Sequence, residues 1–144
     1  MDCDIIKIAQ WSNCSIVMEG QINYLKLNDI EAYKVSFYLS NYVWTIVVTW
    51  DYLSKDTVGK QFIRAIDSIS ANIAEGFGRY NKKDKVKFYR YAMGSVKECL
   101  DWNEKSRIRE LLSREQYNYI FGRLDQMPKL INQLIKYTNI HLKE

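Results

Sequence analysis

The sequence predicts an all-α protein, an antiparallel up-down-up-down four-helix bundle with a short N-terminal arm. Apolar residues recur with a helical period in four long stretches that short polar connections separate. The chain holds one proline and six glycines in 144 residues, and such sparse breakers favour long helices. This length fits one domain with a core of its own. We expect an arm over residues 1–27 and a bundle domain over residues 28–144.

The arm has no readable secondary structure. Its apolar residues follow neither a helical nor an alternating period, so a short strand and a loose arm both remain open. Translation from Met18 is an alternative, in which residues 1–17 are an upstream extension.

The first helix is expected from about Ile30 to Trp50, with Asn28 or Asp29 as its N-cap. Its core-facing side carries Tyr33, Phe37, Val43, Trp44, Val47 and Val48. The aromatic residues Tyr38, Tyr42 and Trp50 lie on other sides. They indicate either contact with a second subunit or packing within one monomer.

A loop over residues 51–55 leads to the second helix, for which Ser54 or Asp56 is the expected cap. One apolar stripe defines this helix: Phe62, Ile66, Ile69, Ile73 and Phe77. Beside it runs a row of small and polar residues: Ala65, Ser68, Asn72 and Glu75. Gly76 and Gly78 are expected to end the helix through the left-handed conformation that glycine adopts readily.

The third helix is expected from about Asp84 to Ser106. Its inner face reads Phe88, Tyr91, Ala92, Ser95, Val96, Cys99 and Trp102. Gly94 lies in the middle of this helix, where glycine costs about 1 kcal/mol relative to alanine. We expect close packing against a neighbouring backbone to compensate.

Ser113 and Gln116 have the spacing of a capping box, which predicts the start of a fourth helix. Its apolar positions are Tyr117, Ile120, Phe121, Leu124, Met127, Leu130, Ile131, Leu134 and Ile135. Pro128 is expected to kink or locally break this helix, because proline lacks a backbone donor.

One stretch resembles a family signature. Residues 68–79 read Ser-Ile-Ser-Ala-Asn-Ile-Ala-Glu-Gly-Phe-Gly-Arg, and the accompanying residues are Gln61, Arg64, Ala65, Phe88, Gly94, Ser95 and Glu98. This pattern resembles the four-helix-bundle proteins encoded by intervening sequences in bacterial 23S rRNA genes, a superfamily that also resembles the accessory proteins of diversity-generating retroelements. The resemblance covers about Leu27 to Tyr137. Residues 1–26 have no counterpart in the family, and Ser70-Ala71 stands where many members have Ile-Pro-Ser.

The resemblance implies a bundle that assembles into a ring-like homo-oligomer, commonly a homopentamer, without an established enzymatic activity. For members beside a retroelement, it implies binding to a reverse transcriptase and to nucleic acid. An rRNA operon would instead indicate the intervening-sequence role.

Charge supports a nucleic-acid partner. The formal net charge is +4, yet residues 79–109 hold ten lysines or arginines against four acidic residues. Six of these cations are the expected phosphate contacts: Arg79, Lys82, Lys83, Lys85, Lys87 and Arg90. Tyr80, Phe88 and Tyr89 lie among them and could stack on bases. The alternative is a solvated helix start that only keeps the protein soluble.

A structural polar network is the second expected feature, and its members are Asn72, Glu75, Ser95 and Glu98. Glu75 opposes the dipole of its own helix, so it either faces water beside Arg79 or is held by Ser95 and Arg90 of the third helix. A ligand contact and catalysis are the other roles open to these residues.

Catalytic and metal-binding patterns are missing from the sequence. His141 is the single histidine, and Gly76-Phe77-Gly78 lacks the lysine and hydroxyl residue of a phosphate loop. The odd count of cysteines, Cys3, Cys14 and Cys99, argues against a disulfide framework and fits a reducing cytoplasm.

We therefore expect no cofactor, no catalytic site, no metal site and no membrane span. The interpretation is a cytoplasmic, non-enzymatic oligomer that binds RNA or DNA. The alternative is an oligomeric protein-interaction module that does not bind nucleic acid.

Overall fold

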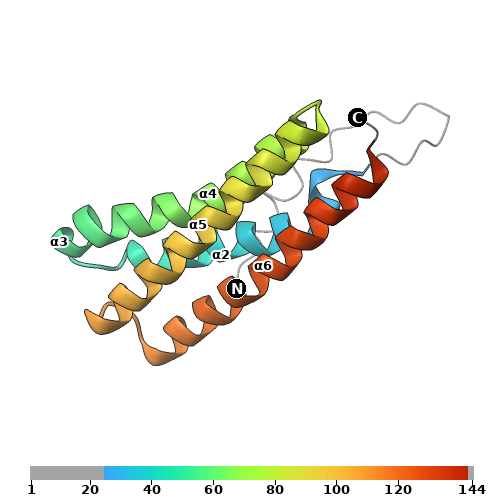
Figure 1. Cartoon of the computed structure of the whole chain (residues 1–144). Helices are drawn as coiled ribbons and strands as arrows, with labels where there is room; N and C mark the ends of the chain where they lie inside the picture. Colours follow the sequence, from blue (N-terminus) through green and yellow to red (C-terminus); the bar gives the residue numbers. More distant parts are fainter. Residues whose placement is uncertain (1–24, 143–144) are drawn as a thin grey trace, which may run out of the picture.

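The computed structural model of the protein describes residues 25–142, and this part of the chain is all-α, without strands (Figure 1). The four long helices are α2 (Glu31–Val47), α4 (Lys60–Gly78), α5 (Lys82–Ile108) and α6 (Arg114–His141). The predicted class and the four predicted helices are therefore confirmed. Most of the expected N-terminal arm, with the alternative start at Met18, lies outside the described residues.

The start of α2 differs from the prediction. Leu27–Asp29 forms a short 3-10 turn, η2, in which an Asp29 carboxylate oxygen accepts a hydrogen bond from the Lys26 backbone N–H at 2.7 Å. Asp29 therefore caps this turn, and the N-cap of α2 is Ile30, whose side chain caps nothing. The helix ends at Val47, and a turn carries the chain to Trp50.

The cap of the second helix was also predicted wrongly. Asp51 is the N-cap of α3 (Tyr52–Ser54), and its carboxylate accepts hydrogen bonds from the Ser54 hydroxyl at 2.6 Å and the Ser54 N–H at 3.1 Å. The hydroxyl bond is the main reason why the pKa of Asp51 is lowered. The expected loop is helical, because α3 passes through a π-helical turn, η3 (Lys55–Gly59), directly into α4.

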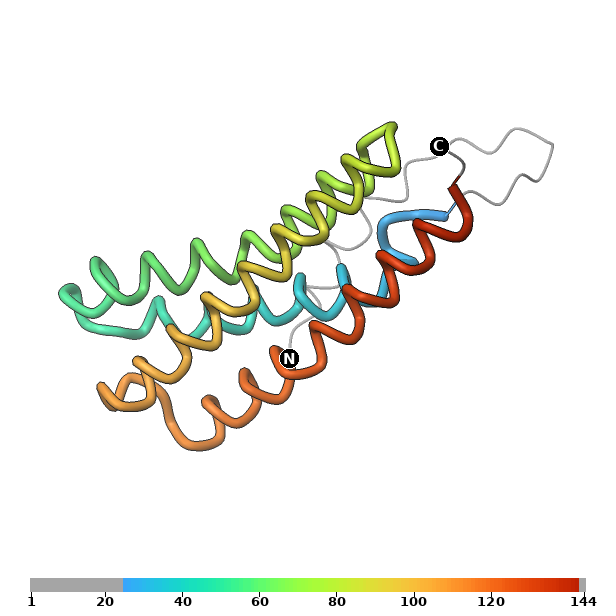
Figure 2. The backbone as a smooth tube through the Cα atoms, in the orientation of Figure 1, coloured from blue at the N-terminus to red at the C-terminus, as the bar shows by residue number. Residues whose placement is uncertain are grey.

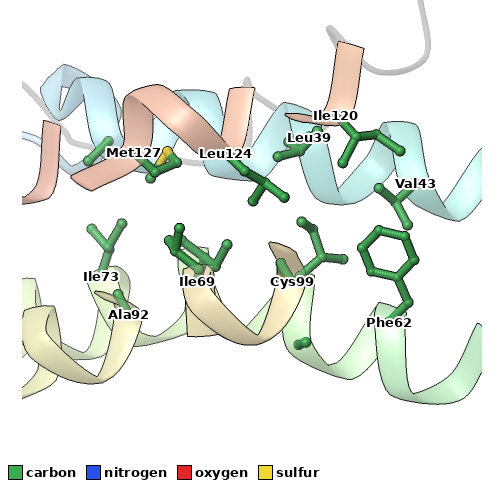
Figure 3. Close-up of a cluster of buried hydrophobic side chains, with 14 of the residues drawn as sticks. Leu39, Val43, Phe62, Ile69, Ile73, Ala92, Cys99, Ile120, Leu124 and Met127 are labelled. Carbon is green, nitrogen blue, oxygen red and sulfur yellow. The ribbon is translucent and has the colours of Figure 1, made fainter. Parts of the chain in front are cut away.

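The four helices enclose one apolar core. Helix α4 packs on α5 and α2, and α6 packs on α5 and α2, so that each helix has two neighbours. Figure 3 shows side chains from all four helices meeting in this core, with Phe62, Ile69 and Ile73 of α4 directed toward α2 and α6. These three residues and Ile66 are fully buried, which confirms the predicted stripe up to Phe77, where burial is partial.

Gly76 has a different role from the predicted one. Helix α4 continues to Gly78, and Arg79 follows in an extended conformation, so no left-handed glycine ends the helix. Gly76 is buried where α4 and α5 approach closely: a Cβ atom there would lie 2.7 Å from Cε1 of Tyr89 and 3.0 Å from the backbone oxygen of Lys85. The glycine is needed because a side chain would not fit.

Two further backbone predictions are corrected. Gly94 is exposed, and a Cβ atom added there would meet nothing within 4 Å, so no close packing within the monomer compensates for it. Helix α6 runs unbroken through Pro128, so the expected local break does not occur, and a kink there stays a prediction. The predicted capping box is confirmed, with hydrogen bonds in both directions between Ser113 and Gln116.

The aromatic residues of α2 divide between the two interpretations. Trp50, in the turn after α2, is buried, and the Tyr42 ring lies 4.5 Å from the Tyr119 ring of α6 between centroids, tilted by 52°, so both pack within the monomer. Tyr38 is 47% exposed and remains available to a partner.

Within residues 25–142, none of the helices combines the length and the apolarity needed to cross a lipid bilayer. Cys99 lies in the core as a free thiol, and burial raises its pKa far above the usual range.

Candidate nucleic-acid interface

The connection between α4 and α5 and the last turn of α6 lie at the same end of the molecule (Figures 1 and 2). A three-residue connection, 79–81, separates the two helices. The Lys82 ammonium donates a long hydrogen bond, 3.5 Å, to the backbone oxygen of Asn139. This contact joins the start of α5 to the end of α6.

An open groove of about 1300 Å³ runs along this end of the molecule. We call it the basic groove. It is lined by Tyr80, Asn81, Lys82, Lys83, Asp84, Val86, Lys87, Arg90, Tyr91, Asn139 and Leu142. The lining therefore holds four cationic side chains and one carboxylate, that of Asp84 in the first turn of α5. The groove is electrostatically suited to a polyanion.

Four of the ten cations of residues 79–109 line this groove. Farther along α5, Lys105 pairs with Asp101 and Arg107 pairs with Glu104, so these cations are locally neutralised. By contrast, Lys82, Lys83, Lys87 and Arg90 form no ion pair with any residue between 25 and 142. Four of the six predicted phosphate contacts are therefore placed together in one groove.

Lys85, a fifth predicted contact, lies elsewhere. Its ammonium donates hydrogen bonds to the backbone oxygens of Phe77 and Gly76 in the last turn of α4, where carbonyls lack a helical partner one turn later. The Gly76 oxygen also accepts a hydrogen bond from the Arg79 N–H at 3.2 Å. A cation is favourable at this position because it complements the negative end of the helix dipole. Partial burial lowers the pKa of Lys85. Its position is explained by the capping of α4, and it does not line the groove.

Arg79, the sixth predicted contact, is also engaged within the protein. Its guanidinium pairs with Glu75 and lies 4.7 Å from the centre of the Phe88 ring. Both side chains of the pair are about half exposed, so Glu75 faces water beside Arg79. This is the first of the two alternatives expected for Glu75. Arg79 is absent from the groove lining.

The expected polar network does not form. Asn72 donates to the Ser68 backbone oxygen at 2.8 Å, and Ser95 donates to the Tyr91 backbone oxygen at 3.2 Å. Glu98 accepts a long hydrogen bond, 3.4 Å, from the Trp102 indole. These three residues are thus bonded within their own helices: Asn72 and Ser95 donate to the carbonyl one turn earlier, and Glu98 accepts from a side chain one turn later. In the described part of the chain, neither Ser95 nor Arg90 contacts Glu75 by a hydrogen bond or ion pair.

The aromatic residues of the groove differ from the expected ones. Tyr80 is 95% exposed, whereas Tyr89 is buried against Gly76 and cannot stack on a base. Tyr91 was expected in the core, but it is 49% exposed and lines the groove. The helical period carried a signal for this, because Tyr91 lies two positions from Tyr89 and therefore points away from it.

No pattern in the sequence indicated that α6 would complete the groove. Asn139 and Leu142 are about 50 to 60 residues from the other lining residues, and only helix packing brings them there. A short-range pattern cannot predict such a contact.

Comparison with known proteins identifies a family and a fold. The family model described as 23S rRNA-intervening sequence protein matches residues 28–133. A crystal structure of a protein of unknown function from the S23 ribosomal protein family of Bacteroides thetaiotaomicron has the same fold, with a TM-score of 0.65 and 24% sequence identity. The match covers 73% of this chain and 98% of that chain. No curated protein matches the sequence.

Proposed function

Because the chain belongs to the 23S rRNA-intervening sequence protein family, we propose that it is a non-enzymatic oligomer that binds nucleic acid through the basic groove. The observation that carries this proposal is the set of four cations without ion-pair partners among the described residues, Lys82, Lys83, Lys87 and Arg90. Each phosphate that a cation neutralises releases a condensed counterion, which favours binding.

Assembly would strengthen this binding. The proposed monomer is an antiparallel up-down-up-down bundle, and the proposed assembly is a ring-like homo-oligomer, in the first instance a pentamer. A ring would repeat the groove once per subunit, and a long polyanion could then engage several grooves at once.

The biological setting has two candidates. The protein is linked either to an rRNA intervening sequence or, as an accessory factor, to a reverse transcriptase. The genes that flank its own gene separate these settings, because a reverse transcriptase gene favours the second. The proposed place of action is the cytoplasm.

The proposal is tested by binding titrations of the purified protein with structured RNA and with single-stranded DNA at 50 and 200 mM salt. If each subunit makes four phosphate contacts, the affinity should fall on the order of 50-fold over this range. Replacing Lys82, Lys83, Lys87 and Arg90 by glutamine should abolish binding.

The matched control replaces four exposed lysines outside the groove by glutamine, which like the groove cations form no ion pair with any residue between 25 and 142: Lys55, Lys97, Lys129 and Lys136. Its net charge changes by the same amount, so the comparison distinguishes loss of the groove cations from a general loss of positive charge. The mass of the oligomer is measured in the same buffers. Equal loss of binding in both variants, or no binding of the intact protein at low salt, would contradict the proposal.

A second candidate function is an oligomeric protein-interaction module. It is favoured by the apolar side chains exposed near the junction of α2 and α3: Trp44, Val48, Tyr52 and Leu53. An apolar interface would bind its partner with little dependence on salt, which distinguishes it from phosphate binding.

A further inference from the structure

Two exposed aromatic residues give the basic groove a preference for one form of nucleic acid. We infer that the groove binds single-stranded nucleic acid, with Tyr80 as the platform on which an unpaired base stacks. This inference rests on the proposed function, because it concerns the same groove.

Tyr80 is the most exposed of the large hydrophobic side chains in the described residues, at 95%. An exposed tyrosine is not unusual by itself. This one, however, lines a groove with Lys82 and Lys83, which lie in the first turn of α5. Single-strand binding requires cations that follow the phosphates and rings that stack on base faces, and both occur here within four residues.

Tyr91 provides a second ring farther along the groove. It is 49% exposed, and the Phe88 ring meets it edge to face at a centroid distance of 5.5 Å, which holds it against α5. Lys87 lies between the two tyrosines in sequence, with its ammonium 5.8 Å from the centre of the Tyr91 ring. At 1.5 Å per residue, the helix rises about 14 Å from Lys82 to Tyr91. The groove can therefore follow a strand over several nucleotides.

A duplex would make less use of these rings. Its base faces are stacked within the helix, and it offers phosphates and base edges at its surface. Phosphate contacts with the four cations would remain, but Tyr80 would find no base face. The exposed ring therefore favours a single strand over a duplex at equal charge contact.

The inference is tested by titrating labelled oligonucleotides of one sequence: a single RNA strand, a single DNA strand and the DNA duplex. We expect both single strands to bind more tightly than the duplex. Tyr80→Ala should weaken single-strand binding by about 5- to 150-fold, the range for loss of one stacked base. It should leave duplex binding unchanged.

Two controls accompany this variant. Tyr80→Phe keeps the ring and should bind single strands as the wild type does. Tyr52→Ala removes a tyrosine that is 81% exposed on α3, outside the groove, and should have no effect. If Tyr80→Ala weakens binding of the RNA strand more than binding of the DNA strand, the result would support the inference and indicate an added contact with the 2′-hydroxyl.

The outcomes separate this inference from the proposed function. If the duplex binds as tightly as the single strands, or if Tyr80→Ala changes no affinity, the single-strand inference is wrong, while loss of binding in the four-cation variant still supports the groove. If none of the probes binds at low salt, both fail.

Discussion

Gly76 and Gly94 lie in opposite environments on the two helices that form the tightest pair. A side chain at Gly76 would collide with Tyr89 and with the backbone of α5, whereas one at Gly94 would enter open space. Packing within the monomer therefore requires a glycine at position 76 but not at position 94.

We expect Gly76→Ala to lower the free energy of unfolding by about 1–3 kcal/mol, because an added methyl group overpacks the contact between α4 and α5. Gly94→Ala should raise it by about 1 kcal/mol, because alanine is the better helix former. Urea unfolding followed by circular dichroism measures both. Equal effects of the same sign would contradict the assigned roles, and a loss of oligomer mass in Gly94→Ala would place that position at a subunit contact.

Cys99 predicts a dependence of stability on alkaline pH. Burial, with added repulsion from Glu98 and Asp67, raises the pKa of its thiol. Above about pH 8.5 the unfolded chain releases the thiol proton, but the folded chain keeps it. The folded state then binds more protons, so the free energy of unfolding should fall by about 1.4 kcal/mol per pH unit through this group.

The measurement compares urea unfolding of the wild type and of Cys99→Ala at several values between pH 7 and 10. The variant should be less stable at pH 7, because it leaves a small cavity, but it should lose less stability as the pH rises. Shifted groups such as Lys85 and Tyr89 are present in both proteins and cancel in the comparison. Parallel curves would show that Cys99 does not titrate in this way.

At the scale of helices, the sequence could predict which segments are helical and, from the Ser113–Gln116 capping box, where α6 begins, but not the caps that precede α2 and α4. The period of Phe62, Ile66, Ile69 and Ile73 identified α4, because burial of one face determines that pattern. The start was missed because Asp51, Ser54 and Asp56 are all good caps, and only the backbone conformation selects among them.

Lys85 shows the same limit for the candidate site. In sequence it is one more cation in a basic run, and only the fold brings its ammonium to the carbonyls of α4. Charge counting could locate the basic segment, but it could not tell groove cations from a capping lysine. That distinction depends on contacts between helices.

Pro128 gives the prediction for this scale. It lies inside α6, where proline leaves the carbonyl one turn earlier without its helical hydrogen bond. Pro128→Ala should restore that bond and raise the free energy of unfolding by about 1–3 kcal/mol. Thermal unfolding followed by circular dichroism measures the change. A less stable variant would mean that the packing of α6 requires the geometry that proline imposes.

At the scale of the whole molecule, the groove depends on segments far apart in the chain. The cations come from α5, Tyr80 comes from the connection before it, and Asn139 and Leu142 come from the end of α6. The period of apolar residues predicted the helices that create this arrangement, and the family match to residues 28–133 confirms the family resemblance. Which side chains would meet at the end of the bundle could not be read from periodicity.

The short connection between α4 and α5 also has a consequence for the route by which the chain folds. Only residues 79–81 separate α4 and α5, which are already in close contact at Gly76, near the end of α4. Closing this hairpin therefore loses little chain entropy. We expect the hairpin to be formed in the folding transition state. Ile69→Val should then mainly slow refolding, whereas Leu134→Ala in α6 should mainly accelerate unfolding, as stopped-flow measurements in urea would show. The reverse pattern would place the folding nucleus at α6.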